Sequence, residues 1–150
     1  MTHVTPDIGT ELINPKAGTK TVFTATAEST GGGHVEVEAT YSPNSAKPAR
    51  HLHPTQTEQF TVLAGSLEMR CGDQSLTATA GHEFAVQPGV GHQMWAGEDG
   101  AVFRWRTTPA LRTGELYCAT WECARDNDWK PTGLQLFEVV SGFADEFRLA

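Results

Sequence analysis

Short runs of alternating polar and apolar residues recur through the middle of the chain. His34–Tyr41 is one example, and such alternation is typical of a β-strand with one buried face. Glycine, proline and aspartate separate the runs at intervals that suit tight turns. The pattern predicts strands at residues 20–28, 34–41, 50–53, 58–63, 66–71, 75–79, 83–87, 92–96 and 101–107.

Because these runs follow one another without helical stretches long enough to link parallel strands, the strands are expected to pair antiparallel. Ala64-Gly65 and Gly72-Asp73 have the composition of hairpin turns, and Gly97–Gly100 separates the last two strands. The predicted fold is all-β, an antiparallel jelly-roll or closed β-barrel over about residues 20–107. Closure would leave few exposed strand edges.

The two ends of the chain have a different character. Residues 1–18 show little periodicity and are predicted to form an arm that ends in a short strand. Within the tail, residues 113–150, Thr113 is a candidate cap for a short helix that runs toward Trp121. A second helix-like spacing, interrupted at Ser141-Gly142, joins Leu134, Phe137, Val140 and Phe147. We expect a short C-terminal helical extension that covers one face of the barrel or reaches a partner subunit.

Size and charge narrow the class of protein. The 150 residues suit one domain, and a hydrophobic share of 39% can fill one core. A net charge of −7 with scattered basic residues argues against nucleic-acid binding. The three cysteines form neither a disulfide framework nor a zinc hook. Without an apolar run of membrane length or a secretion signal at the start, no membrane association and a cytoplasmic location are expected.

Four side chains stand out as candidate metal ligands. His51 and His53 are two residues apart on one strand and therefore share a face. Glu58 opens the next strand with the parity of its apolar residues, so it points inward, and His92 opens a later strand. An ionised carboxylate is costly to bury uncompensated, and three neutral imidazoles cannot neutralise it. A divalent cation can, and it also uses the three imidazole lone pairs.

The ligand types leave the metal open. Three histidine nitrogens and one carboxylate oxygen suit one divalent transition metal: Fe, Mn, Ni, Zn, Co or Cu.

The spacing of these residues resembles the two motifs of the cupin superfamily. Residues 51–65, His-Leu-His-Pro-Thr-Gln-Thr-Glu-Gln-Phe-Thr-Val-Leu-Ala-Gly, are similar to the first motif. Residues 81–92, Gly-His-Glu-Phe-Ala-Val-Gln-Pro-Gly-Val-Gly-His, are similar to the second. All four ligand positions are intact, whereas three turn or surrounding positions depart from the usual pattern: Ser45, Gln87 and Ala96.

The resemblance implies a small single-domain, metal-binding cupin that acts on a small molecule. Many cupins with this ligand set are dioxygenases, and we favour a dioxygenase acting on an aromatic or quinone-like substrate. The first alternative is a non-redox metal enzyme, namely a polyketide cyclase, an isomerase or a decarboxylase. In either enzyme Glu58 is the candidate catalytic residue, because it can shuttle a proton. The second alternative is a cupin that binds a small molecule without catalysis.

Strand parity also predicts which side chains line a substrate pocket. The candidates are Gln56, Phe60, Val62, Met69, Phe84, Met94, Arg104 and Trp105. A homodimer is expected, partly from the resemblance and partly because the Trp-rich, apolar tail needs a surface to bury it.

Overall fold

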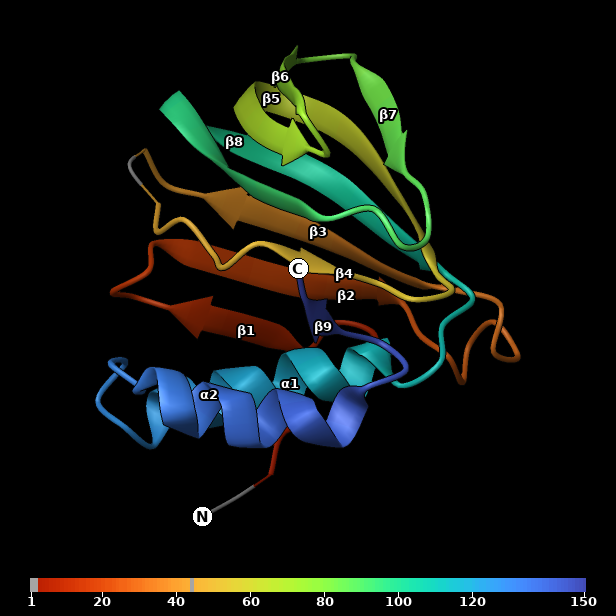
Figure 1. The fold of residues 1–150 in the computed structure, drawn as a ribbon, viewed down its shortest axis with the longest axis vertical. Coiled ribbons are helices and arrows are strands. Elements are labelled where there is room, and N and C mark those ends of the chain that lie inside the picture. Colours follow the sequence, from red (N-terminus) through yellow and green to blue (C-terminus); the bar gives the residue numbers. More distant parts are fainter. Residues whose placement is uncertain (1–2, 44) are drawn as a thin grey trace.

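The computed structural model describes residues 3–43 and 45–150 of the chain (Figure 1). Among these residues, nine strands and two α-helices follow one another in the order β1 to β8, α1, α2, β9, with a short 3₁₀ turn after α2. Their bounds are β1 Glu11–Asn14, β2 Thr19–Ala25, β3 Val35–Tyr41, β4 His51–Leu52, β5 Thr57–Cys71, β6 Gln74–Thr79, β7 Glu83–Val86, β8 His92–Thr108, α1 Thr113–Arg125, α2 Gly133–Val140, the 3₁₀ turn Ser141–Phe143 and β9 Arg148–Leu149.

Two long strands, β5 and β8, organise the sheet. They pair antiparallel from Thr57↔Thr108 to Cys71↔His92, and the remaining strands join them directly or through a neighbouring strand. β1, β2 and β3 extend the sheet from one edge of β8, whereas β6 and β7 pair with β5. Every strand pairing among the described residues is antiparallel, which confirms the predicted all-β class.

Two of the predicted strand breaks are wrong. β5 runs through Ala64-Gly65, and β8 runs through Gly97–Gly100. The glycines instead mark the point where the two paired strands bend and their backbones approach closely. Gly65 has a φ of 71°, and a Cβ there would collide with the carbonyl of Gly100. The register of the pair also shifts on both sides of this point. Gly72-Asp73, in contrast, does form the predicted turn, between β5 and β6.

Apolar side chains gather in two adjoining clusters on the inner face of the curved sheet. One cluster lies inside it and includes Phe60, Val62, Met69, Met94 and Phe103, each at most 5% exposed. A second cluster lies between the sheet and α1 and includes Leu12, Phe23, Val35, Val37 and Cys118. Apolar and polar residues alternate along much of β3, β5 and β8. Buried residues therefore occur at every second position over these stretches.

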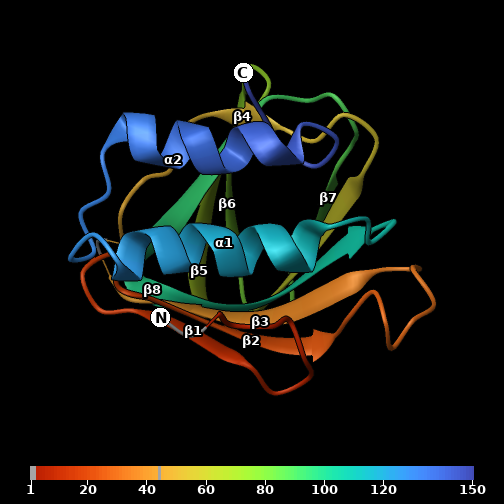
Figure 2. The same ribbon diagram turned by 90° about the horizontal axis from the view of Figure 1, so that it is seen from below.

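The two helices lie side by side across the open end of the sheet, α1 nearer β1 and α2 nearer β4 (Figure 2). The predicted C-terminal helical extension is thus present, but its details differ. Thr113 is the first helical residue and not the cap. Thr132 caps α2 in a reciprocal pair with Gln135, and Phe147 lies beyond the helix. Of the described helices, none combines the length and apolar character that crossing a membrane requires.

Gln56 ties the start of β5 to the turn before α1. Its fully buried side-chain amide donates to the carbonyls of Pro109 (2.9 Å) and Ala110 (3.2 Å) and to Thr113 Oγ1 (2.7 Å). These three acceptors also identify which end of the amide is the nitrogen. Gln56 therefore joins the sheet to the helical tail, and its predicted role in a substrate pocket stays a prediction.

Replacing Gln56 by leucine is expected to lower the free energy of unfolding by about 2–3 kcal/mol, because three acceptors would lose their buried donor. Urea unfolding followed by circular dichroism measures the change. The matched control is Gln59→Leu, at an exposed position of the same strand, where a change within about 0.5 kcal/mol is expected. Equal effects of the two substitutions would contradict this role.

Candidate metal centre

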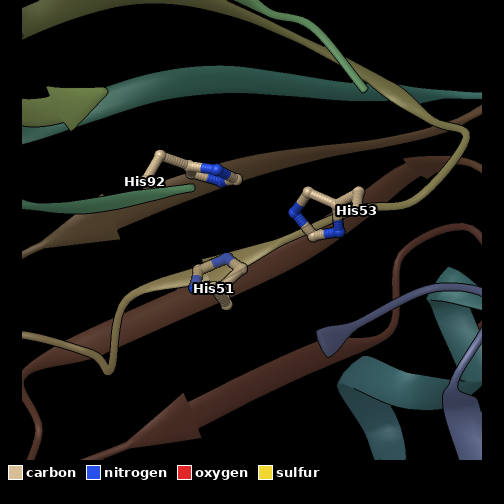
Figure 3. Close-up of side chains that lie close together, drawn as sticks. All are labelled: His51, His53 and His92. Carbon is tan, nitrogen blue, oxygen red and sulfur yellow. The ribbon is translucent and has the colours of Figure 1, made fainter. Parts of the chain in front are cut away.

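Three strands bring the four predicted ligands together. His51 begins β4, His53 follows it, Glu58 lies at the start of β5, and His92 begins β8, where it pairs directly with His51. Figure 3 shows the three imidazole rings converging on a common space. One nitrogen of each ring lies within 4.8 Å of the others. All four side chains are buried, Glu58 completely.

Backbone carbonyls hold the outer nitrogen of each ring. Nδ1 of His51 lies 2.9 Å from the Ala49 oxygen, and Nδ1 of His92 lies 3.0 Å from the Val90 oxygen. Nδ1 of His53 lies 2.6 Å from the Glu146 oxygen, far along the chain. A carbonyl can only accept a hydrogen bond, so each Nδ1 carries a proton, and in the neutral ring the lone pair is on Nε2. The Nε2 atoms are therefore the candidate ligand atoms.

The carboxylate of Glu58 faces two of these nitrogens. Its Oε1 lies 2.9 Å from Nε2 of His53 and 2.7 Å from Nε2 of His92. Its Oε2 accepts a 2.6 Å hydrogen bond from the indole nitrogen of Trp105. With the ring protons on Nδ1, neither His53 Nε2 nor Glu58 Oε1 has a hydrogen-bond partner within the described part of the chain. Acceptor atoms thus face one another at a buried position.

The charges of the cluster follow from its burial. Burial favours the neutral form of Glu58. Hydrogen bonds and charge attraction from the rings of His53 and His92 outweigh the effect of burial and hold the pKa of Glu58 well below its ordinary value, so the carboxylate is ionised. Burial lowers the pKa of His51 to about 4, which keeps that ring neutral. Burial also favours a neutral His53, but the Glu58 carboxylate overcomes this effect and raises the His53 pKa.

A proton and a cation therefore compete for the same lone pair of His53, and the geometry suits the cation. A proton on His53 satisfies one contact and leaves the lone pair of His51 without a partner. Two ligand atoms bound at right angles, each about 2.1 Å from a metal ion, lie about 3 Å apart, close to the distances between Glu58 and the two histidines. The buried group of three histidines and one glutamate thus fits a metal site.

A cavity of about 440 Å³ reaches from His51 and His53 to the helices. Its lining is mainly apolar and comes largely from the tail: Pro48, Ala49, His51, His53, Trp105, Thr113, Leu116, Tyr117, Thr120, Gly133, Leu136, Phe137, Val140, Phe147 and Leu149. Of the eight residues predicted to line a pocket, Trp105 alone is in this set.

The other predicted pocket residues lie elsewhere. Phe60, Val62, Met69 and Met94 pack against one another in the core of the sheet. Phe84 and Arg104 border a separate hollow on the outer face, which Phe60 also touches and which contains no member of the cluster. Parity placed these residues on strand faces, but the cavity is formed by the tail, whose position strand parity does not encode. The sequence signal for this part of the cavity wall was the helix-like spacing of Phe137 and Val140.

The segment after α2 completes the site. Phe147 stacks on the ring of His51, with centroids 4.7 Å apart and planes inclined by 19°. β9 pairs with β4 through His51↔Leu149 and Leu52↔Arg148. The carbonyl of Glu146, next to Phe147, is the acceptor that holds His53. The tail therefore supports two of the three histidines directly.

Comparison with known proteins gives one family match and one related sequence. The model of the cupin domain family matches residues 37–107, a range that contains all four cluster residues. An oxidoreductase of Arthrobotrys oligospora is 34% identical over 50 residues, which are 33% of this chain and 20% of that protein. The match thus spans one fifth of the relative's length.

Solved structures show the same fold at low sequence identity. KdgF from a Halomonas species has 16% identity and a TM-score of 0.56, over 64% of this chain and 84% of its own. An RmlC-like cupin from Shewanella frigidimarina has 18% identity and a TM-score of 0.56, over 65% and 81%. A sugar phosphate isomerase of the cupin superfamily from Silicibacter pomeroyi has 22% identity and a TM-score of 0.51, over 61% and 59%.

A first-row divalent cation is expected to raise the melting temperature of the apoprotein. At about 100 times its dissociation constant it adds about 2.7 kcal/mol, which corresponds to about 5–10 °C for a chain of this size. Differential scanning fluorimetry with Mn, Co, Ni, Zn and Cu measures the shift. Mg²⁺, which prefers oxygen ligands, is the control, and Glu58→Gln should lose most of the shift. No stabilisation by any of the five metals would contradict the fit.

Trp105→Phe is expected to weaken metal binding about tenfold, because it removes the donor to Glu58 Oε2 and keeps an aromatic ring. Competition for zinc with a chromophoric chelator measures the affinity. Trp95→Phe is the matched control on the same strand, since the Trp95 ring contacts Lys47, at 4.3 Å, and lies outside the cluster. A Trp105→Phe protein with unchanged zinc affinity would show that this hydrogen bond has no influence on the carboxylate.

Proposed function

We propose, from the premise that this chain belongs to the cupin superfamily, that it is a metal-dependent dioxygenase of an aromatic or quinone-like small molecule. His51, His53, Glu58 and His92 would bind one divalent transition metal ion. One observation carries the proposal: three imidazole lone pairs and a buried carboxylate converge at the inner end of an apolar, aromatic-rich cavity.

A metal ion bound by these four side chains would keep one or two positions for an oxygenated substrate and O₂. In a dioxygenase reaction both atoms of O₂ enter the organic product. The electrons come from the substrate, so no further reductant is needed. An electron-rich aromatic or quinone-like molecule meets that requirement, and the cavity has the apolar lining that such a molecule needs.

The residues of the chain have distinct roles in this proposal. The carbonyls of Ala49, Glu146 and Val90 orient the histidines, and Trp105 holds one oxygen of Glu58. The other oxygen faces the cluster and is the group that would accept a proton from a substrate hydroxyl. The cavity walls would exclude water from the reacting atoms.

The non-redox alternative shares the metal centre and differs in its need for oxygen. A polyketide cyclase, isomerase or decarboxylase would use the cation to polarise a carbonyl. The uncharged lining does not favour phosphorylated sugars, which need cationic side chains. The name of the Arthrobotrys relative, an oxidoreductase, supports redox chemistry. A cupin that binds a small molecule without turnover is the remaining alternative.

Oxygen consumption tests the proposal. Apoprotein is loaded in turn with Fe(II), Mn, Ni and Cu and mixed with 2,3-dihydroxynaphthalene, and the fall in O₂ is recorded beside the product mass, which should rise by two oxygen atoms. His53→Ala should lose most of the bound metal by elemental analysis and with it the O₂ uptake. His82→Ala, at an exposed turn outside the cluster, is the matched control and should keep both.

The contrary results separate the alternatives. Turnover of zinc-loaded protein under argon would replace the dioxygenase with a non-redox enzyme. Binding of these molecules without any turnover would favour a binding protein. Full metal content in the His53→Ala protein would overturn the metal centre itself.

A further inference from the structure

We infer that the cavity next to the histidine cluster accepts an uncharged, planar aromatic molecule that presents a single oxygenated edge to the cluster and buries an apolar body beneath α2. This inference rests on the proposed function, since it identifies the substrate class of the same site. It goes further because it states where a substrate can and cannot carry polar groups.

The lining sets the charge of the occupant. Among the residues that border the cavity, none is Asp, Glu, Lys or Arg within the described chain. A sulfonate, phosphate or carboxylate on the body of a ligand would be buried there without a counter-charge, and an unpaired buried charge is strongly unfavourable.

Three polar side chains of the lining, Thr113, Thr120 and Trp105, already have partners in the protein. Thr113 Oγ1 accepts from Gln56, and the Thr120 hydroxyl donates to carbonyls of its own helix. The Trp105 indole donates to Glu58. The candidate ligand atoms of the histidine cluster are thus the main polar atoms open to an occupant of the cavity. A substrate should therefore carry its oxygens on the edge that faces the cluster.

Aromatic faces around the cavity suit a planar body. Phe147 covers His51 in a nearly parallel stack, and the rings of Trp105 and Tyr117, 5.2 Å apart, form another part of the wall. Leu136, Phe137 and Val140 of α2 cover the side toward solvent. No residue of α2 is fully buried, and Phe137 is 55% exposed. An apolar body beneath α2 would therefore cover surface that the protein alone leaves partly exposed.

Two probes that differ only in body charge test this inference: 2,3-dihydroxynaphthalene and its 6-sulfonate. Calorimetric titration of zinc-loaded protein under argon gives both affinities without oxygen chemistry. The neutral probe should bind at least about tenfold more tightly, because the sulfonate would have to be buried unpaired. Equal affinities, or tighter binding of the sulfonate, would overturn the inference.

Charge placed in the lining should invert the preference. Leu136→Arg puts a cation beside the proposed body position, so the sulfonate should gain affinity relative to the neutral probe. Leu134→Arg is the matched control, with the same substitution on the same helix at a residue that is 68% exposed and outside the lining, and the affinity ratio should stay as in the unaltered protein. Val140→Arg serves as a second lining variant if the first does not fold, as judged by circular dichroism.

These outcomes are separable from those of the proposed function. The affinity ratio is measured with zinc and without O₂, so a protein that fails the oxygen test can still show the charge preference. Conversely, O₂ uptake with unchanged discrimination in both lining variants would retain the dioxygenase and refute the body position beneath α2.

Discussion

The carboxylate of Glu58 imposes the strongest constraint on this protein. It is completely buried and remains ionised, so the fold must compensate a full negative charge inside the protein. Trp105 provides one hydrogen bond. The remaining oxygen faces His53 and His92, whose own acceptor nitrogens point back at it. The arrangement is unfavourable for the side chains alone and favourable around a divalent cation, so the cluster fits a metal site.

The bent strands are the means by which this cluster is assembled. β5 and β8 each begin with a cluster residue, Glu58 near the start of β5 and His92 at the start of β8, and contribute core residues along the rest of their length. At the bend of β5, the lack of a side chain on Gly65 lets its backbone approach the carbonyl of Gly100 in β8. β4 is then short and pairs with the start of β8 on one side and with β9 on the other, so His51 is held from both edges.

The sequence predicted the cluster because the governing rules are local. His51 and His53 alternate along one strand, and the turn before Glu58 and the one before His92 place those residues at strand starts. The departures at Ser45 and Ala96 caused no loss, since the Ala96 amide donates to the Ser45 hydroxyl in the structure. The breaks predicted at Gly65 and at Gly97–Gly100 are wrong, because turns and places where two paired backbones approach closely both favour glycine.

The cavity could not be predicted in the same way, because its walls depend on packing between distant segments. Strand parity separates inner from outer residues, and it correctly placed Phe60 and Met69 inside, but inside proved to be solid core. The buried amide of Gln56 illustrates the same limit: its three acceptors lie more than fifty residues away in sequence. Nothing in the local pattern around Gln56 distinguishes a residue that binds a substrate from one that anchors a helix.

The division between sheet and tail has a chemical consequence. All four cluster residues come from the sheet, whereas the surface that would contact a substrate comes mainly from α1, α2 and the segment around Phe147. Side chains of the tail can therefore change without altering the cluster atoms. The exceptions are the Glu146 carbonyl, which holds His53, and Phe147, which covers His51. Through these two contacts a substrate that displaced α2 or Phe147 would also disturb the histidines, so the fold couples occupation of the cavity to the geometry of the cluster.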